Sequence, residues 1–287
     1  MKRNNLSGKE LSWLIRRHGI EMTHLSKGSH IASVLSVADI IGVLYAEIIN
    51  VDPSNPKSEE RDYFVLSKGH AGAAIYAALA EMGFFDRSIL KTHYQDGSIL
   101  SGHVSHKEVP GVDASTGSLG HGLSYAVGMA LALKKQGRNN KVYVVLGDGE
   151  CDEGAVWEAA LMANEYCLKN IIAIIDRNQM QSLDFTENTA KLEPLADKWR
   201  AFNWNVINVN GHDHEALRLS LEKAQGSVAP TIIIADTIKG KGISFMELNI
   251  LWHYRFPHPG QEYDQALQEL KDQKPETVND PYEVIGK

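Results

Sequence analysis

Two short apolar segments of the chain end in side chains that could hold a divalent cation. Gly147-Asp148-Gly149 directly follows Lys141–Leu146, and Asn178 follows Asn170–Asp176. Both segments are β-branched runs without polar alternation, a pattern typical of strands covered on both faces of a parallel sheet. Ligands of such a sheet bind beyond the carboxyl ends of the strands. If the two strands are neighbours, Asp148 and Asn178 therefore face one crevice.

The chemistry of this pair favours magnesium. A carboxylate and an amide oxygen make a poor zinc site, whereas Mg²⁺ prefers oxygen ligands and completes its octahedron with water and phosphate oxygens. A helix predicted to begin at Ala155 would point its positive N-terminal end at the same crevice and favour an anion. The alternative for Gly-Asp-Gly alone is an Asp-Gly turn. The preceding strand and the second strand end favour a magnesium-bound diphosphate instead.

Three histidines have small neighbours, which mark open loop backbone and not a packed core. His30 follows Gly28-Ser29, His70 lies in Gly-His-Ala-Gly, and His103 lies in Ser-Gly-His. Loop histidines exchange protons near neutral pH, so we interpret these three as functional, although a chain of this size also carries structural histidines. His253, in Trp-His-Tyr, is added without the glycine context. The other histidines outside the motifs are expected at the surface: His18, His24, His212, His214 and His258.

Lys239-Gly240-Lys241-Gly242 follows another predicted strand, Thr231–Asp236. One interpretation is a solvated basic turn. The other is a loop over the diphosphate that leads on to His253. A glycine pattern at 117, 120 and 122 has the wrong spacing for a dinucleotide motif, and no phosphate-loop lysine is present.

The elements that must position these residues alternate between strand and helix. The expected strands are Lys141–Leu146, Asn170–Asp176, Asn205–Asn208 and Thr231–Asp236, and the expected helices are Ser36–Ile49, Ala71–Met82, Leu119–Lys135, Ala155–Leu168 and His214–Ala224. Such alternation predicts parallel pairing with right-handed crossovers. The fold class is therefore a doubly wound, mostly parallel α/β sheet with helices on both faces. Residues 1–245 are expected to form this domain, and residues 246–287, which are polar and lack a strong periodic signal, a C-terminal extension or docking arm.

Bulk composition narrows the functional class. The 287 residues are 43% hydrophobic and 23% charged, as in ordinary globular proteins. The formal charge of -7 argues against nucleic acid, because neutralising phosphates needs a surplus of Lys and Arg. Two cysteines, Cys151 and Cys167, favour a reducing compartment. No signal-peptide pattern follows the basic start, and no uninterrupted apolar run approaches the ~20 residues of a membrane span. We expect a cytoplasmic protein without a membrane segment.

The motifs together resemble those of thiamine-diphosphate enzymes, and of transketolases in particular. Gly147-Asp148-Gly149 with Asn178 resembles the cofactor fingerprint that many decarboxylases and dehydrogenases share. The segments that resemble transketolases are Lys27-Gly28-Ser29-His30, Ser67-Lys68-Gly69-His70-Ala71, Ser101-Gly102-His103, the run from Ser115 to Gly122, and Glu150-Cys151-Asp152-Glu153-Gly154 after the fingerprint. The resemblance extends from about Ser26 to His253.

This resemblance implies thiamine diphosphate and Mg²⁺ as cofactors and assigns roles to individual residues. It implies that Asp148, Asn178 and the main-chain oxygen of Met180 bind the metal. The implied cofactor contacts are His70, Gly117, Leu119, Asp148, Gly149, Glu153 and Asn178. The implied catalytic, substrate-side histidines are His30, His103 and His253. Glu153 and Glu158 match acidic positions between paired active sites, while Ser118 and His121 depart from the Pro and Gln of many members and could shift substrate preference.

The resemblance also implies a reaction and a partner. Transketolases transfer a two-carbon ketol unit from a ketose, usually phosphorylated, to an aldose. A complete member continues into a pyrimidine-binding domain and a C-terminal domain, which supply the glutamate that activates the cofactor, and no glutamate of this chain is assigned that role. We therefore expect the N-terminal subunit of a split transketolase, with a second subunit of similar size in an α2β2 assembly.

Two other interpretations stay open. The α chain of a thiamine-dependent 2-oxo acid dehydrogenase, or a decarboxylase subunit, would share the fingerprint but would not need His30, His70 and His103 as a set. A non-catalytic binding module would need only the diphosphate site. The set of histidines favours the transketolase, and a branched or sulfonated sugar fits the sequence as well as a pentose phosphate.

Overall fold

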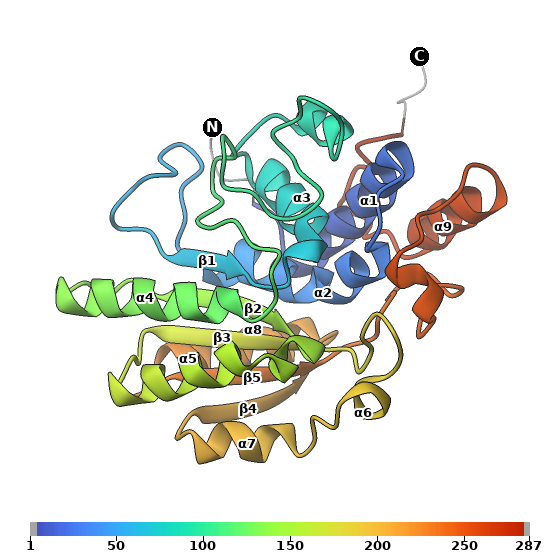
Figure 1. Ribbon diagram of the computed structural model, residues 1–287. Coiled ribbons are helices and arrows are strands. Elements are labelled where there is room, and N and C mark those ends of the chain that lie inside the picture. Colours follow the sequence, from blue (N-terminus) through green and yellow to red (C-terminus); the bar gives the residue numbers. More distant parts are fainter. Residues whose placement is uncertain (1–4, 284–287) are drawn as a thin grey trace.

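A five-stranded parallel sheet forms the centre of the protein, whose computed structural model describes residues 5–283 (Figure 1). The strands are β1 (Tyr63–Leu66), β2 (Val142–Gly147), β3 (Ile171–Arg177), β4 (Asn205–Asn210) and β5 (Thr231–Asp236). Their order across the sheet is β1-β2-β3-β5-β4, and every neighbouring pair is parallel. The predicted doubly wound, mostly parallel α/β fold is thus confirmed.

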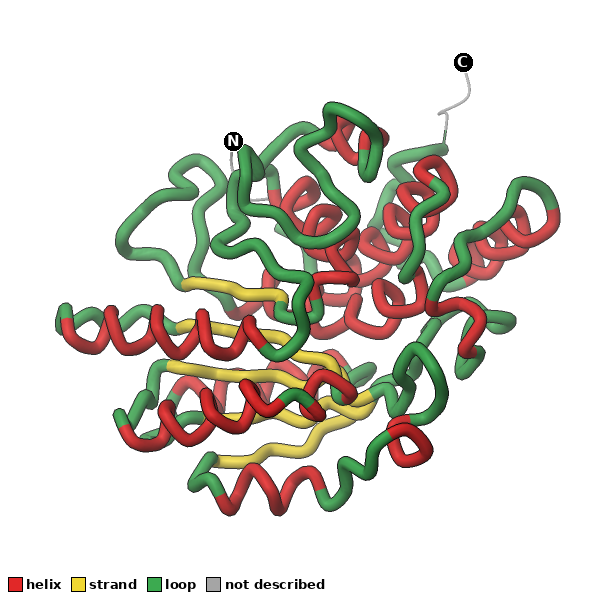
Figure 2. The backbone as a smooth tube through the Cα atoms, viewed as in Figure 1, coloured by secondary structure: helices red, strands yellow, loops and turns green. Residues whose placement is uncertain are grey.

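Helices cover both faces of this sheet (Figure 2). One hydrophobic core unites one face with α1 (Gly8–Ser26), α2 (Ile31–Val43), α3 (Gly72–Met82) and α8 (His214–Gln225). A second core unites the opposite face with α4 (His121–Lys135), α5 (Gly154–Glu165) and α7 (Leu195–Ala201). The remaining helices are the short α6 (Thr186–Thr189) and α9 (Gln261–Asp272), which lies against α1.

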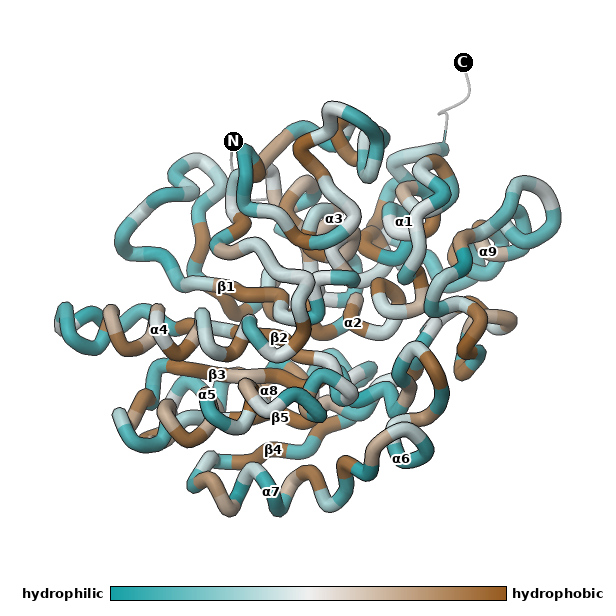
Figure 3. The backbone as a smooth tube through the Cα atoms, viewed as in Figure 1, coloured by the Kyte–Doolittle hydropathy of each residue, from teal (hydrophilic) through white to brown (hydrophobic). Residues whose placement is uncertain are grey.

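The central strands are apolar along their whole length because both faces are covered (Figure 3). In β2, Tyr143 and Val145 point into the first core, and Val144 and Leu146 into the second. This two-sided burial explains why the strands read as continuous β-branched runs. The helices at the ends of these strands are therefore held on a rigid frame, and the loops that leave the strands are positioned by it.

One apolar run is longer than the sequence suggested. Ile31–Ile48, which comprises α2 and the π-helical turn Leu44–Ile48, is apolar and long enough to cross a membrane by length and composition alone. In the structure 83% of this window is buried, and α2 packs against α1, α3 and α8. The core helix of a globular domain has the same appearance.

The structure adds two elements to the predicted set and moves a third. Neither β1 nor α1 was predicted; α1 buries Arg16, Arg17 and His18 beside its apolar residues, so its hydrophobic periodicity is masked. The helix expected from Ser36 begins at Ile31, directly after His30, whose backbone has a left-handed φ of 73°. That conformation is uncommon for a residue with a side chain, and no sequence pattern indicated it.

Residues 261–272 form a regular helix where a polar segment without periodicity was expected. Ala266 and Leu270 are fully buried against the first core, and the indole nitrogen of Trp13 on α1 donates a hydrogen bond to the Leu270 carbonyl oxygen (2.8 Å). Val278 completes a small cluster with Trp13 and Leu14. The wrong expectation arose because only two positions of this helix are fully buried.

Leu270→Ala should therefore destabilise the whole chain. Removing a buried leucine side chain costs about 2–5 kcal/mol of unfolding free energy, and the loss should appear in the global denaturation curve. Leu219→Ala on α8 is the matched control, because Leu219 is 51% exposed and the change should stay within about 0.5 kcal/mol. An unchanged midpoint for Leu270→Ala would show that α9 does not belong to the cooperative unit.

Candidate active site

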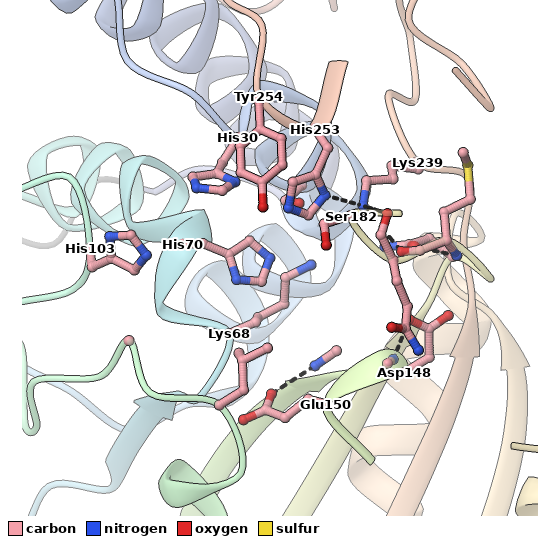
Figure 4. Close-up of a pocket in the computed structure, with 18 residues that line it drawn as sticks. His30, Lys68, His70, His103, Asp148, Glu150, Ser182, Lys239, His253 and Tyr254 are labelled. Carbon is pink, nitrogen blue, oxygen red and sulfur yellow. Dashed lines mark hydrogen bonds between the residues drawn. The ribbon is translucent and has the colours of Figure 1, made fainter. Parts of the chain in front are cut away.

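A cavity of about 410 Å³ opens at the carboxyl edge of the sheet (Figure 4). Its walls come from the segments that follow β1, β2, β3 and β5, together with the start of α2 and the segment around residue 253. The site residues predicted from the sequence that line it are His30, His70, His103, Gly117, Leu119, Asp148, Gly149, Asn178, Met180 and His253. Open parallel sheets bind ligands at this edge, so the expected location of the site agrees with the structure.

Asp148 and Asn178 meet because β2 and β3 are neighbours. Gly147 at the end of β2 pairs with Asp176 at the end of β3, so both strands leave the sheet at one level. The Asp148 carboxylate accepts hydrogen bonds from the main-chain N–H groups of Gly149 (2.8 Å) and Gln179 (2.5 Å). The turn after β3 is thereby fastened to the turn after β2.

The remaining donors at this point suit an oxygen-binding cation. The side-chain nitrogen of Asn178 faces Ser36 and Asp176, and its oxygen accepts from the Met180 N–H (3.1 Å). Burial, with the nearby Asp176 carboxylate, raises the pKa of Asp148 to about 6. Within residues 5–283 Asp148 has no ion-pair partner, so a bound cation would relieve a buried, uncompensated carboxylate.

The site does not belong to the His/Cys/carboxylate type. Across the described chain no cluster of three or more His, Cys, Asp or Glu side chains is arranged for a metal. The predicted set contributes only one such side chain, Asp148, and adds an amide oxygen and a main-chain oxygen. These hard oxygen donors fit Mg²⁺ with phosphate and water as its other ligands.

Two buried lysines line the same cavity, and the sequence pattern indicated a role for only one of their segments. Lys68 is 1% exposed and forms an ion pair with Asp176, which also accepts hydrogen bonds from Ser36 and Thr237. Its signal was its place in Ser-Lys-Gly-His, directly after the strand β1, which went unrecognised. Lys68 thus has a carboxylate partner beneath the cavity floor.

Lys239 is 2% exposed and resolves the alternatives for the Lys-Gly-Lys-Gly loop. Its ammonium lies 3.1 Å from the Met180 carbonyl oxygen and 2.8 Å from Nδ1 of His253, and none of the ion pairs in the described chain includes it. Burial and the charge of Lys68 lower its pKa to about 8. The loop therefore presents a cation to the cavity, and is not a solvated turn.

Four predicted histidines form one cluster on the wall opposite Asp148 (Figure 4). The ring of His30 lies 5.2 Å from that of His70, 5.7 Å from that of His103 and 5.0 Å from that of His253, centroid to centroid. The His30 N–H donates to the His253 carbonyl oxygen (3.0 Å). Residues more than two hundred positions apart are thus joined through the backbone. Tyr254, which was not predicted, adds its ring to the cluster.

The environment keeps three of these imidazoles neutral at pH 7. Burial, with the nearby His103 and Lys239, lowers the pKa of His30 to about 4. Burial and Lys239 lower the pKa of His253 to about 3, and burial and Lys68 hold the pKa of His70 well below its usual value. A neutral imidazole has one donor and one acceptor nitrogen. The Nδ1 atom of His30 is buried without a partner in the described structure, so it is available to a ligand.

Glu150 organises the loops that form the cavity floor. Its carboxylate accepts hydrogen bonds from the Ser67 hydroxyl, from the N–H of Gly120 (2.8 Å) and from the N–H of Gly147 (3.1 Å). Gly120, with a left-handed φ of 84°, comes directly after the 117–119 segment that lines the cavity. One buried carboxylate thus links the ends of β1 and β2 to the loop before α4.

Two acidic residues lie outside this cavity. Glu153 is exposed at the N-terminal cap of α5, and Glu158 is exposed on the same helix. The structure does not bring either carboxylate to the cavity wall, and their implied roles stay predictions.

The expectation that the other histidines lie at the surface is wrong for His18, which is 1% exposed and bonds Glu81 and the Tyr282 hydroxyl. His212 and His214 are partly buried on Asp39. Polar partners supplied by distant segments make these burials possible, and sequence neighbours do not reveal such partners. His258 is exposed, as expected.

Comparison with known proteins agrees with this site. Residues 8–250 match the family described as the transketolase thiamine diphosphate binding domain. One of the two subunits named for apulose-4-phosphate transketolase, from Phocaeicola vulgatus, is 41% identical over 90% of this chain and 91% of its own length. A subunit of 6-deoxy-6-sulfo-D-fructose transketolase from a Clostridium species is 44% identical over 78% of this chain and 82% of its own.

The solved structure of transketolase from Campylobacter jejuni superimposes with a TM-score of 0.86 at 30% identity, and covers 93% of this chain. Only 42% of that longer protein is matched. Transketolase from Leishmania mexicana gives a TM-score of 0.82 at 27% identity, with 94% of this chain and 44% of that protein covered. The chain belongs to the transketolase family, as an N-terminal subunit that contains its thiamine-diphosphate-binding domain.

Proposed function

We propose that this chain holds thiamine diphosphate through Mg²⁺ and, together with a second subunit, transfers a two-carbon ketol unit from a ketose phosphate to an aldose. The observation that carries the proposal is the single cavity that contains both a cation site, at Asp148 and Asn178, and a cluster of neutral histidines. A pure binding module would not need the second feature. We also propose a cytoplasmic location, and a division into residues 1–245 and a C-terminal extension, residues 246–287.

The residues at the sheet edge fit the diphosphate end of the cofactor. Asp148, the Asn178 side-chain oxygen and the Met180 main-chain oxygen would hold Mg²⁺, and Lys239 supplies a further positive charge beside them. Space is restricted at Gly149, where an added Cβ would lie 2.6 Å from the Gln181 side chain. When bound, thiamine diphosphate supplies the carbanion stabilisation that the reaction needs. The protein supplies placement and charge.

The histidine cluster fits a polyhydroxylated substrate. Neutral imidazoles donate at one nitrogen and accept at the other, so adjacent rings can bind neighbouring hydroxyl groups and exchange a proton with them. The free Nδ1 of His30 is one such position, and His103, which is exposed, lies at the open side of the cluster. Relatives of this chain are named for apulose 4-phosphate and 6-deoxy-6-sulfo-D-fructose, which are sugars with an anionic group. We propose the same class of substrate here.

The second subunit is proposed from the relatives and from the surface. Several similar proteins are named as subunits, and complete transketolases are more than twice as long as the matched part. Helices α4 and α5 lie side by side and expose large apolar side chains, namely Tyr125, Leu161, Met162 and Tyr166. Neighbouring exposed apolar residues mark interaction surfaces. We propose that the second subunit covers this face, caps the cavity and completes an α2β2 assembly.

Asp148→Asn should weaken cofactor binding without unfolding the chain. The change keeps the shape of the side chain but removes the charge that binds the cation, so the affinity for thiamine diphosphate with Mg²⁺ should fall by roughly 10- to 100-fold or more. Calorimetric titration measures this, and EDTA should cause a similar loss in the unmodified protein. Asp197→Asn, at an exposed position of α7, is the control. Undiminished affinity in Asp148→Asn contradicts the metal assignment.

His30→Asn should separate binding of the cofactor from turnover. Asparagine tolerates the left-handed backbone at this position but lacks an imidazole, so kcat/KM for ketol transfer should fall by roughly 10²-fold or more, with cofactor affinity nearly unchanged. The assay needs the second subunit. His258→Asn, at an exposed site, should leave both quantities unchanged. Full turnover by His30→Asn would remove this histidine from the proposed chemistry.

Leu161→Glu should prevent assembly with the second subunit. A charge at this exposed position of α5 would have to be desolvated in an apolar interface, so co-purification with the product of the adjacent reading frame should be lost together with activity. Leu219→Glu on α8 exposes a similar leucine on the other face and should assemble normally. Ketol transfer by the isolated, unmodified chain would contradict the need for a partner.

A further inference from the structure

A buried polar cluster lies behind the cavity wall and involves residues that have no place in the proposed chemistry. Asp39 of α2 accepts two hydrogen bonds from the Arg16 guanidinium of α1 (2.9 and 2.6 Å). Its two oxygens also bind Nδ1 of His212 and Nε2 of His214, each at 2.7 Å. Burial alone would raise the pKa of the Asp39 carboxyl, but Arg16 and the two imidazoles outweigh burial and hold it well below its usual range. The cluster therefore contains a firmly ionised carboxylate.

This cluster grips the loop that carries Lys239 on both sides. The main-chain N–H of Ile238 donates to Nε2 of His212 (2.8 Å). On the other side of Lys239, the Nε of Arg16 donates to the Lys241 carbonyl oxygen (3.2 Å). Both contacts involve the backbone, so they fix the path of the loop whatever the side chains of residues 238 and 241 are.

The contact with Ile238 also fixes the state of the His212 ring. An imidazole nitrogen that accepts a hydrogen bond must carry a lone pair, so Nε2 is unprotonated and the ring proton is on Nδ1, where it is donated to Asp39. Asp39 thus selects the tautomer in which His212 can accept from the loop. The same arrangement, in which a carboxylate orients a histidine that acts on a third group, recurs around ligand sites.

We propose that His212, oriented by Asp39, is a positioning residue that presents Lys239 to the cavity. Lys239 is almost completely buried and follows Ile238 directly, so its ammonium reaches the Met180 oxygen and His253 only from this backbone path. Glycine at 240, with a φ of 82° and a main-chain bond to Ala32, then turns the chain away from the cavity. The proposal rests on the proposed function in one respect: Lys239 is taken to serve the bound diphosphate.

His214 provides a matched control within the same cluster. It contacts the same carboxylate at the same distance, but no hydrogen bond joins its side chain to residues 237–242 in the described structure. If the cluster only stabilises the fold, loss of either histidine should have similar effects. If His212 positions the loop, only its loss should be felt at Lys239.

The first test does not involve the cofactor. In His212→Asn the amide can reach Asp39 but is too short to accept from Ile238, whereas in His212→Gln it can reach the Ile238 N–H. Hydrogen–deuterium exchange measured by mass spectrometry should show about tenfold faster exchange in the 237–246 peptide for His212→Asn, the effect of losing one hydrogen bond. His212→Gln and His214→Asn should resemble the unmodified protein. Equal protection in all four proteins would overturn the proposal, and so would equal loss in His212→Asn and His214→Asn.

The second test measures the affinity for thiamine diphosphate at fixed Mg²⁺ in the same proteins. His212→Asn should bind about 3- to 10-fold more weakly, again the effect of one hydrogen bond, and His212→Gln should restore most of the affinity. Combining His212→Asn with Lys239→Met should weaken binding no further than Lys239→Met alone. Additive losses would overturn the positioning role. If the unmodified protein binds no thiamine diphosphate, the proposed function fails, while the exchange result still decides whether His212 holds the loop.

Discussion

The parallel pairing of β2 with β3 is the constraint on which the site depends. Gly147 lies opposite Asp176, so the two turns beyond them emerge at one level and Asp148 and Asn178 face the same space. The pairing is fixed by apolar side chains that are buried in both cores. A slip of one residue would exchange the two faces of a strand, so the hydrophobic pattern of the sheet also determines the spacing of the polar groups at its edge.

The cavity concentrates positive charge without a matching number of carboxylates. Asp176 offsets Lys68 from beneath, whereas Lys239 faces the cavity with only neutral acceptors beside it. The two lysines and burial suppress protonation of the surrounding imidazoles, so the cations stay at one end and the neutral donors and acceptors at the other. This division matches a ligand with an anionic end and a hydroxylated end. Asp148 contributes the single uncompensated negative charge, at the point where a divalent cation would be held.

The sequence predicted the parts of the structure that local pattern determines. Buried strands such as Lys141–Leu146 and the glycine-flanked Asp148 carry their own signals, and four histidines recognised from their neighbours and the family resemblance do converge. The parts that were missed depend on distant partners. Helix α1 buries Arg16 only because Asp39 lies on α2, and Lys68 is tolerated in the interior only because Asp176 lies beneath it. A prediction based on hydrophobic periodicity assigns such charged residues to the surface, and therefore loses both the helix and the lysine.

The main-chain bond between His30 and the carbonyl of His253 has a consequence for altering substrate range. The two rings are presented by segments from opposite ends of the chain, yet their backbones are fastened to each other, and His30 holds a left-handed conformation that few residues accept. A library that varies either segment alone would disturb the geometry of both walls. Redesign of this pocket for a new sugar should therefore diversify the two segments jointly, and retain at position 30 the residue types that tolerate a positive φ.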